Sequence, residues 1–192
     1  MSKRLLREFY IQPTLRAAKQ MLGKYLVHKI GNKKLIGKIV ETEAYIGPED
    51  KASHAFGGKM TERNKAEYLI GGHIYIYLVY GMYWQLNIST GKEGLPECVL
   101  IRALEPLYPK SHTLDPNIAN GPGKLCRWMR FNKSFYGEDL VKSNRVWLED
   151  RGERIKPNQI IASKRVGIDY AQEWAERPWR FHIKNNKFVS KT

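Results

Sequence analysis

The chain has 192 residues, of which 42% are hydrophobic and 27% are charged, a balance typical of one folded domain and unlike that of a disordered or membrane-embedded chain. Its 33 lysines and arginines outnumber its 19 acidic residues and give a net charge of +14, which favours a polyanionic partner, with nucleic acid ahead of an anionic membrane. The two cysteines and five histidines show no metal-binding spacing, so we expect no zinc and no disulfide framework.

The predicted elements begin after a basic N-terminal segment that leads into no apolar stretch of signal-peptide or membrane-spanning length, so we expect a cytoplasmic protein. A short helix is predicted over residues 14–22, because Leu15, Ala18 and Leu22 follow helical spacing between Pro13 and Gly23. Residues 25–30 and 35–45 then predict an antiparallel hairpin around a turn at 31–34.

A second hairpin is predicted from residues 73–80 and 84–90, around the turn Gly81-Met82-Tyr83. A helix is expected after Gly121-Pro122. Further strands are predicted over residues 97–104, 146–148, 160–163 and 180–183. This mixture indicates an α+β fold, one domain over residues 1–192, built around an antiparallel sheet.

Charge is unevenly distributed along these elements. Residues 1–40 carry ten basic and one acidic residue, residues 41–110 carry seven and nine, and residues 111–192 carry sixteen and nine. Basic flanks that bind an anion around a central acidic site would give this pattern, and so would an ordinary solvated surface.

Three polar side chains alternate along the second strand of the first hairpin: Glu41, Glu43 and Tyr45. Alternate strand residues share a face, so the two carboxyl groups and the phenol are expected side by side. A solvated strand edge explains the same pattern and is the simpler explanation of the strand alone.

The polar loop that follows contains His54 and lies at a strand end, where functional sites are often built. For His54 by itself, a structural role is the simpler explanation.

Aromatic residues are concentrated in the second hairpin. Tyrosines suit strands, so Tyr75 is expected in the core or on a sheet face. Tyr80, Met82 and Tyr83 surround Gly81 at the predicted turn, where large apolar side chains would be exposed unless they bind something. At a hairpin tip of a basic protein, such side chains fit a wedge that enters the minor groove of DNA and unstacks a base step.

Motifs along nearly the whole chain resemble one known family. In order, they are VETEAYIGPED, ASHAFGG, TERN, YIYLVYGMYWQLNIS, CVLIRALEP, NGPGKLC, RVGI and EWAERPWRF. In this combination the sequence is similar to the alkyladenine DNA glycosylases, also known as 3-methyladenine or N-methylpurine DNA glycosylases of the mammalian type. The resemblance implies a curved antiparallel sheet with surrounding helices and a protruding hairpin that intercalates into DNA. Residues 112–120 match no motif of the family.

The resemblance also implies roles for individual residues. Glu43 matches the general base that activates the attacking water, and Arg102 matches an arginine beside that site. Tyr45, His54 and Tyr77 match residues around the flipped base, and the backbone amide at His54 resembles the donor that reads the purine.

Further matches concern discrimination and DNA contact. Asn87 matches the asparagine that rejects guanine through its exocyclic amino group. Tyr80 matches the intercalating tyrosine, and Met82 and Tyr83 lie beside it at the expected DNA contact. The implied reaction is the base-excision repair of duplex DNA by a monomer without a cofactor or a metal. Its substrates are alkylated purines, namely 3-methyladenine and 7-methylguanine, with hypoxanthine and ethenoadenine as further candidates. The enzyme would work at the nucleoid of a bacterium or in the nucleus of a eukaryote.

The chemistry of this reaction fits the residue types. A base inside a duplex must be extruded into a pocket before water can reach its glycosidic bond, and an alkylated purine leaves readily because it is positively charged. One ionised carboxylate then suffices to position water. Glu41 and Glu43 are equivalent on sequence grounds, and only the resemblance selects Glu43. Lys38 and Lys51 are the lysines nearest to it in sequence, and neither is expected beside it, so we expect a monofunctional enzyme.

Two alternatives remain open from the residues. Basic charge with clustered aromatics also serves a non-catalytic RNA- or single-strand-binding module. A carbohydrate hydrolase could use Glu41 and Glu43 as a carboxylate pair, although adjacent residues on one strand face flank a sugar poorly.

Overall fold

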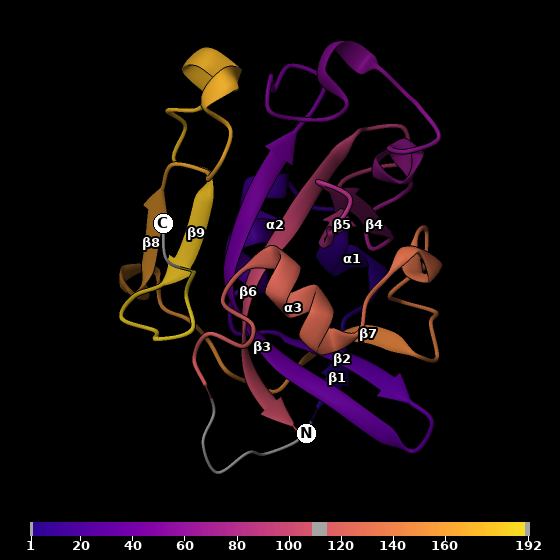
Figure 1. Ribbon diagram of the computed structural model, residues 1–192, viewed down its shortest axis with the longest axis vertical. Coiled ribbons are helices and arrows are strands. Elements are labelled where there is room, and N and C mark those ends of the chain that lie inside the picture. Colours follow the sequence, from indigo (N-terminus) through magenta and orange to yellow (C-terminus); the bar gives the residue numbers. More distant parts are fainter. Residues whose placement is uncertain (1, 109–114, 191–192) are drawn as a thin grey trace.

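The structure is a computed structural model, which describes residues 2–108 and 115–190. One antiparallel sheet of nine strands organises the described residues (Figure 1). Its main path runs β1-β7-β2-β3-β6-β5-β4, while β9 pairs with both β3 and β8 off this path. The strands are β1 (Lys3–Arg4), β2 (Tyr25–Ile30), β3 (Lys33–Ile46), β4 (Ile74–Val79), β5 (Tyr83–Ser89), β6 (Glu97–Tyr108), β7 (Val146–Asp150), β8 (Ile160–Ser163) and β9 (Arg180–Ile183).

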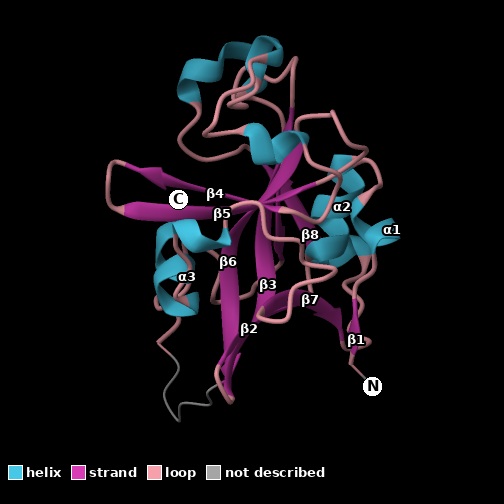
Figure 2. Ribbon diagram, turned by 90° about the vertical axis from the view of Figure 1, so that its right-hand side faces the viewer, coloured by secondary structure: helices cyan, strands magenta, loops and turns pink. Residues whose placement is uncertain are grey.

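Helices cover both sides of the central strands. Figure 2 shows α3 on one side of β3 and β6, with α1 and α2 on the other. The α-helices are α1 (Arg7–Tyr10), α2 (Thr14–Met21) and α3 (Pro122–Met129). Short 3-10 helices occur in the connections: η1 (Phe56–Gly58), η2 (Lys65–Tyr68), η3 (Lys133–Phe135), η4 (Pro157–Gln159) and η5 (Asp169–Trp174). Their apolar faces and the sheet enclose one main core, which includes Met21, Leu26, Ile39, Ile74, Leu86, Ile88, Leu104 and Leu125.

The α+β prediction with a curved antiparallel sheet and a protruding hairpin is confirmed. Figure 2 shows β4 and β5 projecting crosswise from the central strands. The helix α2 and the strands β2, β8 and β9 match the predicted ranges to within a residue. Of the unmatched segment 112–120, residues 112–114 lie outside the described residues.

Four details differ from the prediction. The first turn comprises only Gly31 and Asn32, so β3 begins at Lys33. The second turn lies one residue earlier than expected and comprises Tyr80, Gly81 and Met82, of which Tyr80 and Gly81 have positive φ. Tyr83 is therefore the first residue of β5. The strand β6 continues to Tyr108, and the short elements α1 and β1 carry too little periodicity to be predicted.

The pairing of β3 with β6 is interrupted by bulges beside Glu41. Ile39 pairs with Leu104, Glu41 with Ala103 and Thr42 with Ile101. Val40 is thus an extra residue on β3, and Arg102 is an extra residue on β6. Bulges redirect side chains and increase local twist. Here they place an arginine of β6 against the acidic residues of β3.

Candidate active site

The carboxylates Glu41 and Glu43 are fully buried, which contradicts the simpler explanation of a solvated strand edge. β3 has β6 on one edge and β9 on the other at these residues, so no edge is left to solvent there. The Arg102 guanidinium bridges the two acids, with Nε 3.2 Å from Oε1 of Glu41 and Nη1 3.3 Å from Oε1 of Glu43. The expected common face of the two carboxyl groups is therefore present.

Glu41 is held entirely by structural contacts. Ser190 donates from its backbone N–H at 2.8 Å and from its hydroxyl at 2.9 Å. Arg180 forms an ion pair with Glu41 at 3.1 Å, in addition to the pair with Arg102. A carboxylate with this many fixed partners is suited to a structural role. The structure thus distinguishes the roles of two acids that are equivalent in the sequence.

Glu43 has a different environment. Its Oε1 accepts a hydrogen bond from the backbone N–H of Val166 at 2.9 Å, and its Oε2 accepts one from the Tyr45 hydroxyl at 2.9 Å. Burial raises the pKa of Glu43, and the charge of Arg102 and these two hydrogen bonds oppose the rise. A carboxylate with a raised pKa binds a proton more readily, as a general base must.

A polar cavity of about 670 Å³, which we name the central cavity, lies directly in front of Glu43. Its walls include Tyr45, Arg102 and Val166, the three residues that contact Glu43, while Glu43 itself lies behind them. The other lining residues are Ala52, His54, Arg63, Glu67, Tyr75, Tyr77, Leu78, Val79, Tyr80, Gly81, Gln85, Asn87, Cys98, Leu100, Pro122, Gly167, Ile168 and Tyr170. The described structure thus brings Tyr45, His54, Tyr77, Asn87 and Arg102 to one cavity.

Aromatic rings form one wall of the central cavity. The His54 ring lies edge-on to Tyr77, with 4.6 Å between centroids, and its Nδ1 is 2.6 Å from the Tyr75 hydroxyl. Desolvation among these rings and, second, the charge of Arg63 lower the pKa of His54, which favours the neutral imidazole. Tyr75 is buried in the core as predicted, and it also lines the cavity. The backbone N–H of His54 donates no hydrogen bond within the described residues.

The inner end of the central cavity contains Asn87, Cys98 and Glu67, all buried. The Asn87 amide donates to the carbonyl oxygens of Tyr75 at 3.2 Å and Gln85 at 3.4 Å, which fixes the orientation of the side chain. Its Oδ1 lies 3.8 Å from the Cys98 sulfur. Sequence reasoning missed Cys98 and Glu67 as cavity residues. Glu67 lies in a short 3-10 helix without strand alternation, so no periodic signal marked it.

The tip of the β4–β5 hairpin stands at the mouth of the central cavity. Tyr80 is 86% exposed, Met82 65% and Tyr83 40%, so the three residues expected to contact DNA are the exposed apolar groups of this tip. Tyr83 packs against Gly123 of α3, where an added Cβ would lie only 2.9 Å from its ring. The glycine of the NGPGKLC motif thus allows α3 to support the hairpin.

A buried ion pair, Arg165 with Asp50, lies next in sequence to the cavity residue Val166. Arg165 contacts both carboxylate oxygens of Asp50, at 2.5 and 2.9 Å, and donates to the carbonyl oxygen of Ala44 at 3.0 Å. Its guanidinium also stacks on the Tyr45 ring. This pair joins the loop after β3 to the segment that supplies Val166. Sequence reasoning missed this pair, although Asp50 and Arg165 both lie in motifs noted above, VETEAYIGPED and RVGI.

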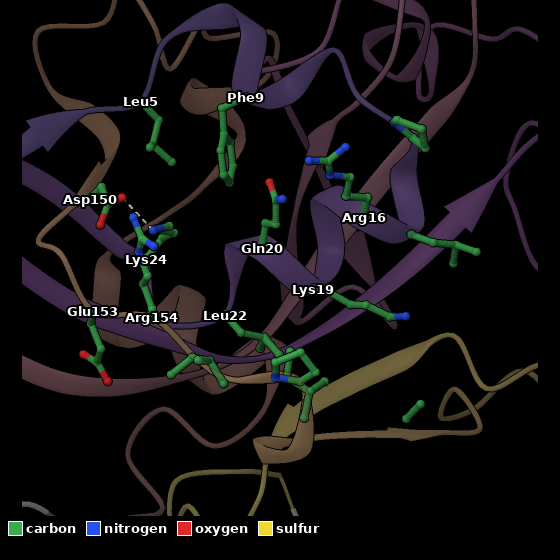
Figure 3. Close-up of a pocket in the computed structure, with 16 residues that line it drawn as sticks. Leu5, Phe9, Arg16, Lys19, Gln20, Leu22, Lys24, Asp150, Glu153 and Arg154 are labelled. Carbon is green, nitrogen blue, oxygen red and sulfur yellow. Dashed lines mark ion pairs between the residues drawn. The ribbon is translucent and has the colours of Figure 1, made fainter.

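A larger cavity of about 940 Å³ lies elsewhere, between α2, β7 and β8 (Figure 3). Its walls are mainly apolar, and the acid Asp150 there is paired with Lys24 at 2.8 Å. It contains none of the residues expected at the active site. Size alone therefore does not identify the functional cavity.

The described residues contain no cluster of three or more potential metal ligands. They also contain no helix of the length and apolar character that a membrane crossing needs.

Comparisons with known proteins show the family to which the chain is related. The family model described as methylpurine-DNA glycosylase (MPG) matches residues 8–187. A protein of Clostridium novyi is 47% identical, covering 98% of this chain and 99% of its own length, and one of Desulfitobacterium hafniense is 45% identical, covering 98% of each chain. Both carry the name "Putative 3-methyladenine DNA glycosylase". Because the family model matches residues 8–187 and these relatives are 45–47% identical over 98% of the chain, the chain belongs to the methylpurine-DNA glycosylase family.

Proposed function

We propose that this enzyme removes alkylated purines from duplex DNA, by flipping the damaged nucleotide into the central cavity and hydrolysing its glycosidic bond with a water activated by Glu43. The observation that carries the proposal is the position of the Glu43 carboxylate, one residue layer behind the cavity wall and hydrogen-bonded to two of its members. The family gives the class of reaction, and 3-methyladenine and 7-methylguanine are the proposed substrates.

The walls suit a flipped purine. Aromatic stacking contributes about 1–3 kcal/mol per base, and the rings of Tyr45, Tyr77 and His54 line the cavity that would receive the base. A cationic purine is electron-poor and stacks well on electron-rich phenol rings. The free backbone N–H of His54 supplies a donor for the purine edge. The fixed amide of Asn87 supplies steric and hydrogen-bonding discrimination against guanine's exocyclic amine.

Glu43 would act when the base has entered. The water that attacks C1′ of the sugar gives its proton to the carboxylate, while the electron pair of the broken bond leaves with the base. The negative charge of Glu43 also stabilises positive charge that develops on the sugar. Arg102 holds the carboxylate in place and keeps a positive charge beside it. Neither step requires a cofactor.

The hairpin would hold the duplex open. Tyr80 can occupy the space that the flipped nucleotide leaves, as apolar wedges do in minor-groove binders. Met82 and Tyr83 extend the contact to neighbouring nucleotides. The net charge of +14 supports binding of phosphates with strong salt dependence. We propose that one molecule acts alone on DNA, and the bacterial relatives favour action at the nucleoid.

The proposal is tested by base release under single-turnover conditions. Duplexes with one 7-methylguanine or 3-methyladenine and undamaged duplexes are incubated with the protein, and free base is measured by chromatography. We expect release of the damaged base only, with an abasic site left in an uncut strand. Binding without release would favour the non-catalytic alternative.

A further inference from the structure

Glu67 is a buried acid for which the proposed mechanism has no use. It lies in η2, is 2% exposed and lines the central cavity together with Asn87 and Cys98. Its Oε1 is 3.8 Å from the Cys98 sulfur, a weak donor. Its Oε2 has no hydrogen-bond partner among the described residues. A buried polar atom without a hydrogen-bond partner costs about 1–3 kcal/mol. Such an atom beside a binding cavity therefore points to a ligand that supplies the missing hydrogen bond.

The surroundings of Glu67 favour the protonated acid. The described titratable groups that interact with it are the Cys98 thiol from β6 and the hydroxyls of Tyr68 in η2, Tyr75 and Tyr77 in β4, and Tyr136 directly after η3. No described lysine or arginine forms an ion pair with it: the Arg63 guanidinium lies over the Tyr77 ring instead. Burial raises the pKa of Glu67 to about 8, so the carboxyl group holds a proton at neutral pH.

We propose that Glu67 is the catalytic acid for neutral purine lesions, donating its carboxyl proton to a ring nitrogen of the flipped base as the glycosidic bond breaks. This inference rests on the proposed function, since it needs a base in the central cavity. The O–H bond of Glu67 breaks and an N–H bond forms on the purine. The electron pair of the C1′–N bond leaves with the base, and water adds to C1′ and gives its proton to Glu43. Both carboxyl groups then return to their starting state by exchange with solvent.

The other titratable groups of the cavity are poorer proton donors. The lowered pKa of His54 leaves a neutral imidazole at pH 7, so no imidazolium is available. Burial raises the pKa of the Cys98 thiol and of the Tyr75 and Tyr77 hydroxyls, which makes them still weaker acids. Glu43 is the group that accepts a proton from water. Among the described residues of the cavity, Glu67 alone combines a proton at neutral pH with a pKa near the working range, as an efficient acid catalyst requires.

The charge of the damaged base decides whether the reaction needs an acid. An alkylated purine such as 7-methylguanine already carries the positive charge that makes it a good leaving group, so it needs no acid. Hypoxanthine and ethenoadenine are neutral and need a proton. Loss of Glu67 should therefore affect the neutral bases selectively.

The experiment compares wild type, Glu67→Gln and Glu67→Met in single-turnover release of 7-methylguanine, hypoxanthine and ethenoadenine. Glutamine keeps the size and a hydrogen-bond donor but is not an acid, and methionine fills the space with an apolar chain. For both variants we expect the rate on the neutral bases, relative to the rate on 7-methylguanine, to fall by about 100-fold or more. Circular dichroism spectra and thermal unfolding, compared with wild type, show that each variant is folded.

The pH profile gives an independent measurement. Wild-type release of ethenoadenine should fall about tenfold per pH unit above a pH of about 8, because the acid is then ionised, and the Glu67→Gln profile should lack this fall. The inference is overturned if wild type releases 7-methylguanine but neither neutral base, if Glu67→Gln keeps wild-type rates on the neutral bases, or if all three bases slow equally. Failure of wild type to release 7-methylguanine would instead refute the proposed function.

Discussion

The same substitution should have opposite effects at the two buried acids of β3. Glu41→Gln should lower the stability of the protein, whereas Glu43→Gln should lower its activity. In Glu41→Gln, a charge that is fully buried and pairs with Arg102 and Arg180 is removed, while Ser190 keeps one acceptor. Breaking a buried ion pair costs about 3–5 kcal/mol. Since glutamine retains part of the hydrogen bonding, we expect about 3 kcal/mol, which for a chain of this size lowers Tm by about 6–12 °C.

In Glu43→Gln the expected effects are reversed: the thermal stability is kept and the base-release activity is lost. The folded-state pKa of Glu43 is raised by burial, so its stabilising contribution is complete below the unfolded pKa and is lost as pH rises through the folded pKa. Glutamine does not ionise, so the variant should have a Tm equal to or above that of wild type at pH 7–8. This difference should shrink as the pH falls towards 4.5. Release of 7-methylguanine should drop by about 10²–10⁴-fold.

Thermal unfolding by circular dichroism and single-turnover base release measure the two effects, at a temperature where both variants are folded. Gel-shift titration with a lesion duplex provides the control, since both variants should still bind it. A Glu41→Gln protein that is as stable as wild type but inactive, beside an active Glu43→Gln protein, would refute the assignment of Glu43 as the base.

Three further variants and one trapping experiment follow from the geometry. Tyr80→Ala should leave Tm unchanged, because the side chain is 86% exposed, and should weaken lesion-duplex binding by about 1–3 kcal/mol in titrations; binding equal to wild type would remove the wedge role. Asn87→Ala should raise the release of guanine-type bases relative to adenine-type bases, and an unchanged ratio would place Asn87 outside recognition. Gly123→Ala should cost about 1–3 kcal/mol in denaturant unfolding, since its Cβ would lie 2.9 Å from the Tyr83 ring; unaltered stability would show that the hairpin shifts freely. Incubation with lesion duplex and borohydride should give no covalent protein–DNA product, because no lysine lines the described central cavity, whereas a crosslinked band would make a lysine the nucleophile.

Much of the fold could be predicted from local patterns in the sequence. The α2 helix, the strands β2, β8 and β9, and the two hairpins depend on spacing and turn residues within a few positions of each other. The α+β class and the exposed aromatic tip followed from the same local signals. The resemblance of the motifs indicated the family, because these motifs occur in one order along nearly the whole chain.

The tertiary structure decided what distinguishes residues that look alike in sequence. Glu41 and Glu43 share a strand face, but only the bulges of β3 and β6, the β9 strand and the contact with Ser190 assign Glu41 to structural partners and leave Glu43 behind the cavity wall. Glu67 is an ordinary acid in sequence. It becomes a cavity residue, with no ion-pair partner in the described part of the chain, only when β4, β5 and β6 close around it. Local periodicity cannot carry such information, because burial and proton affinity depend on groups that are distant along the chain and adjacent only in the folded protein.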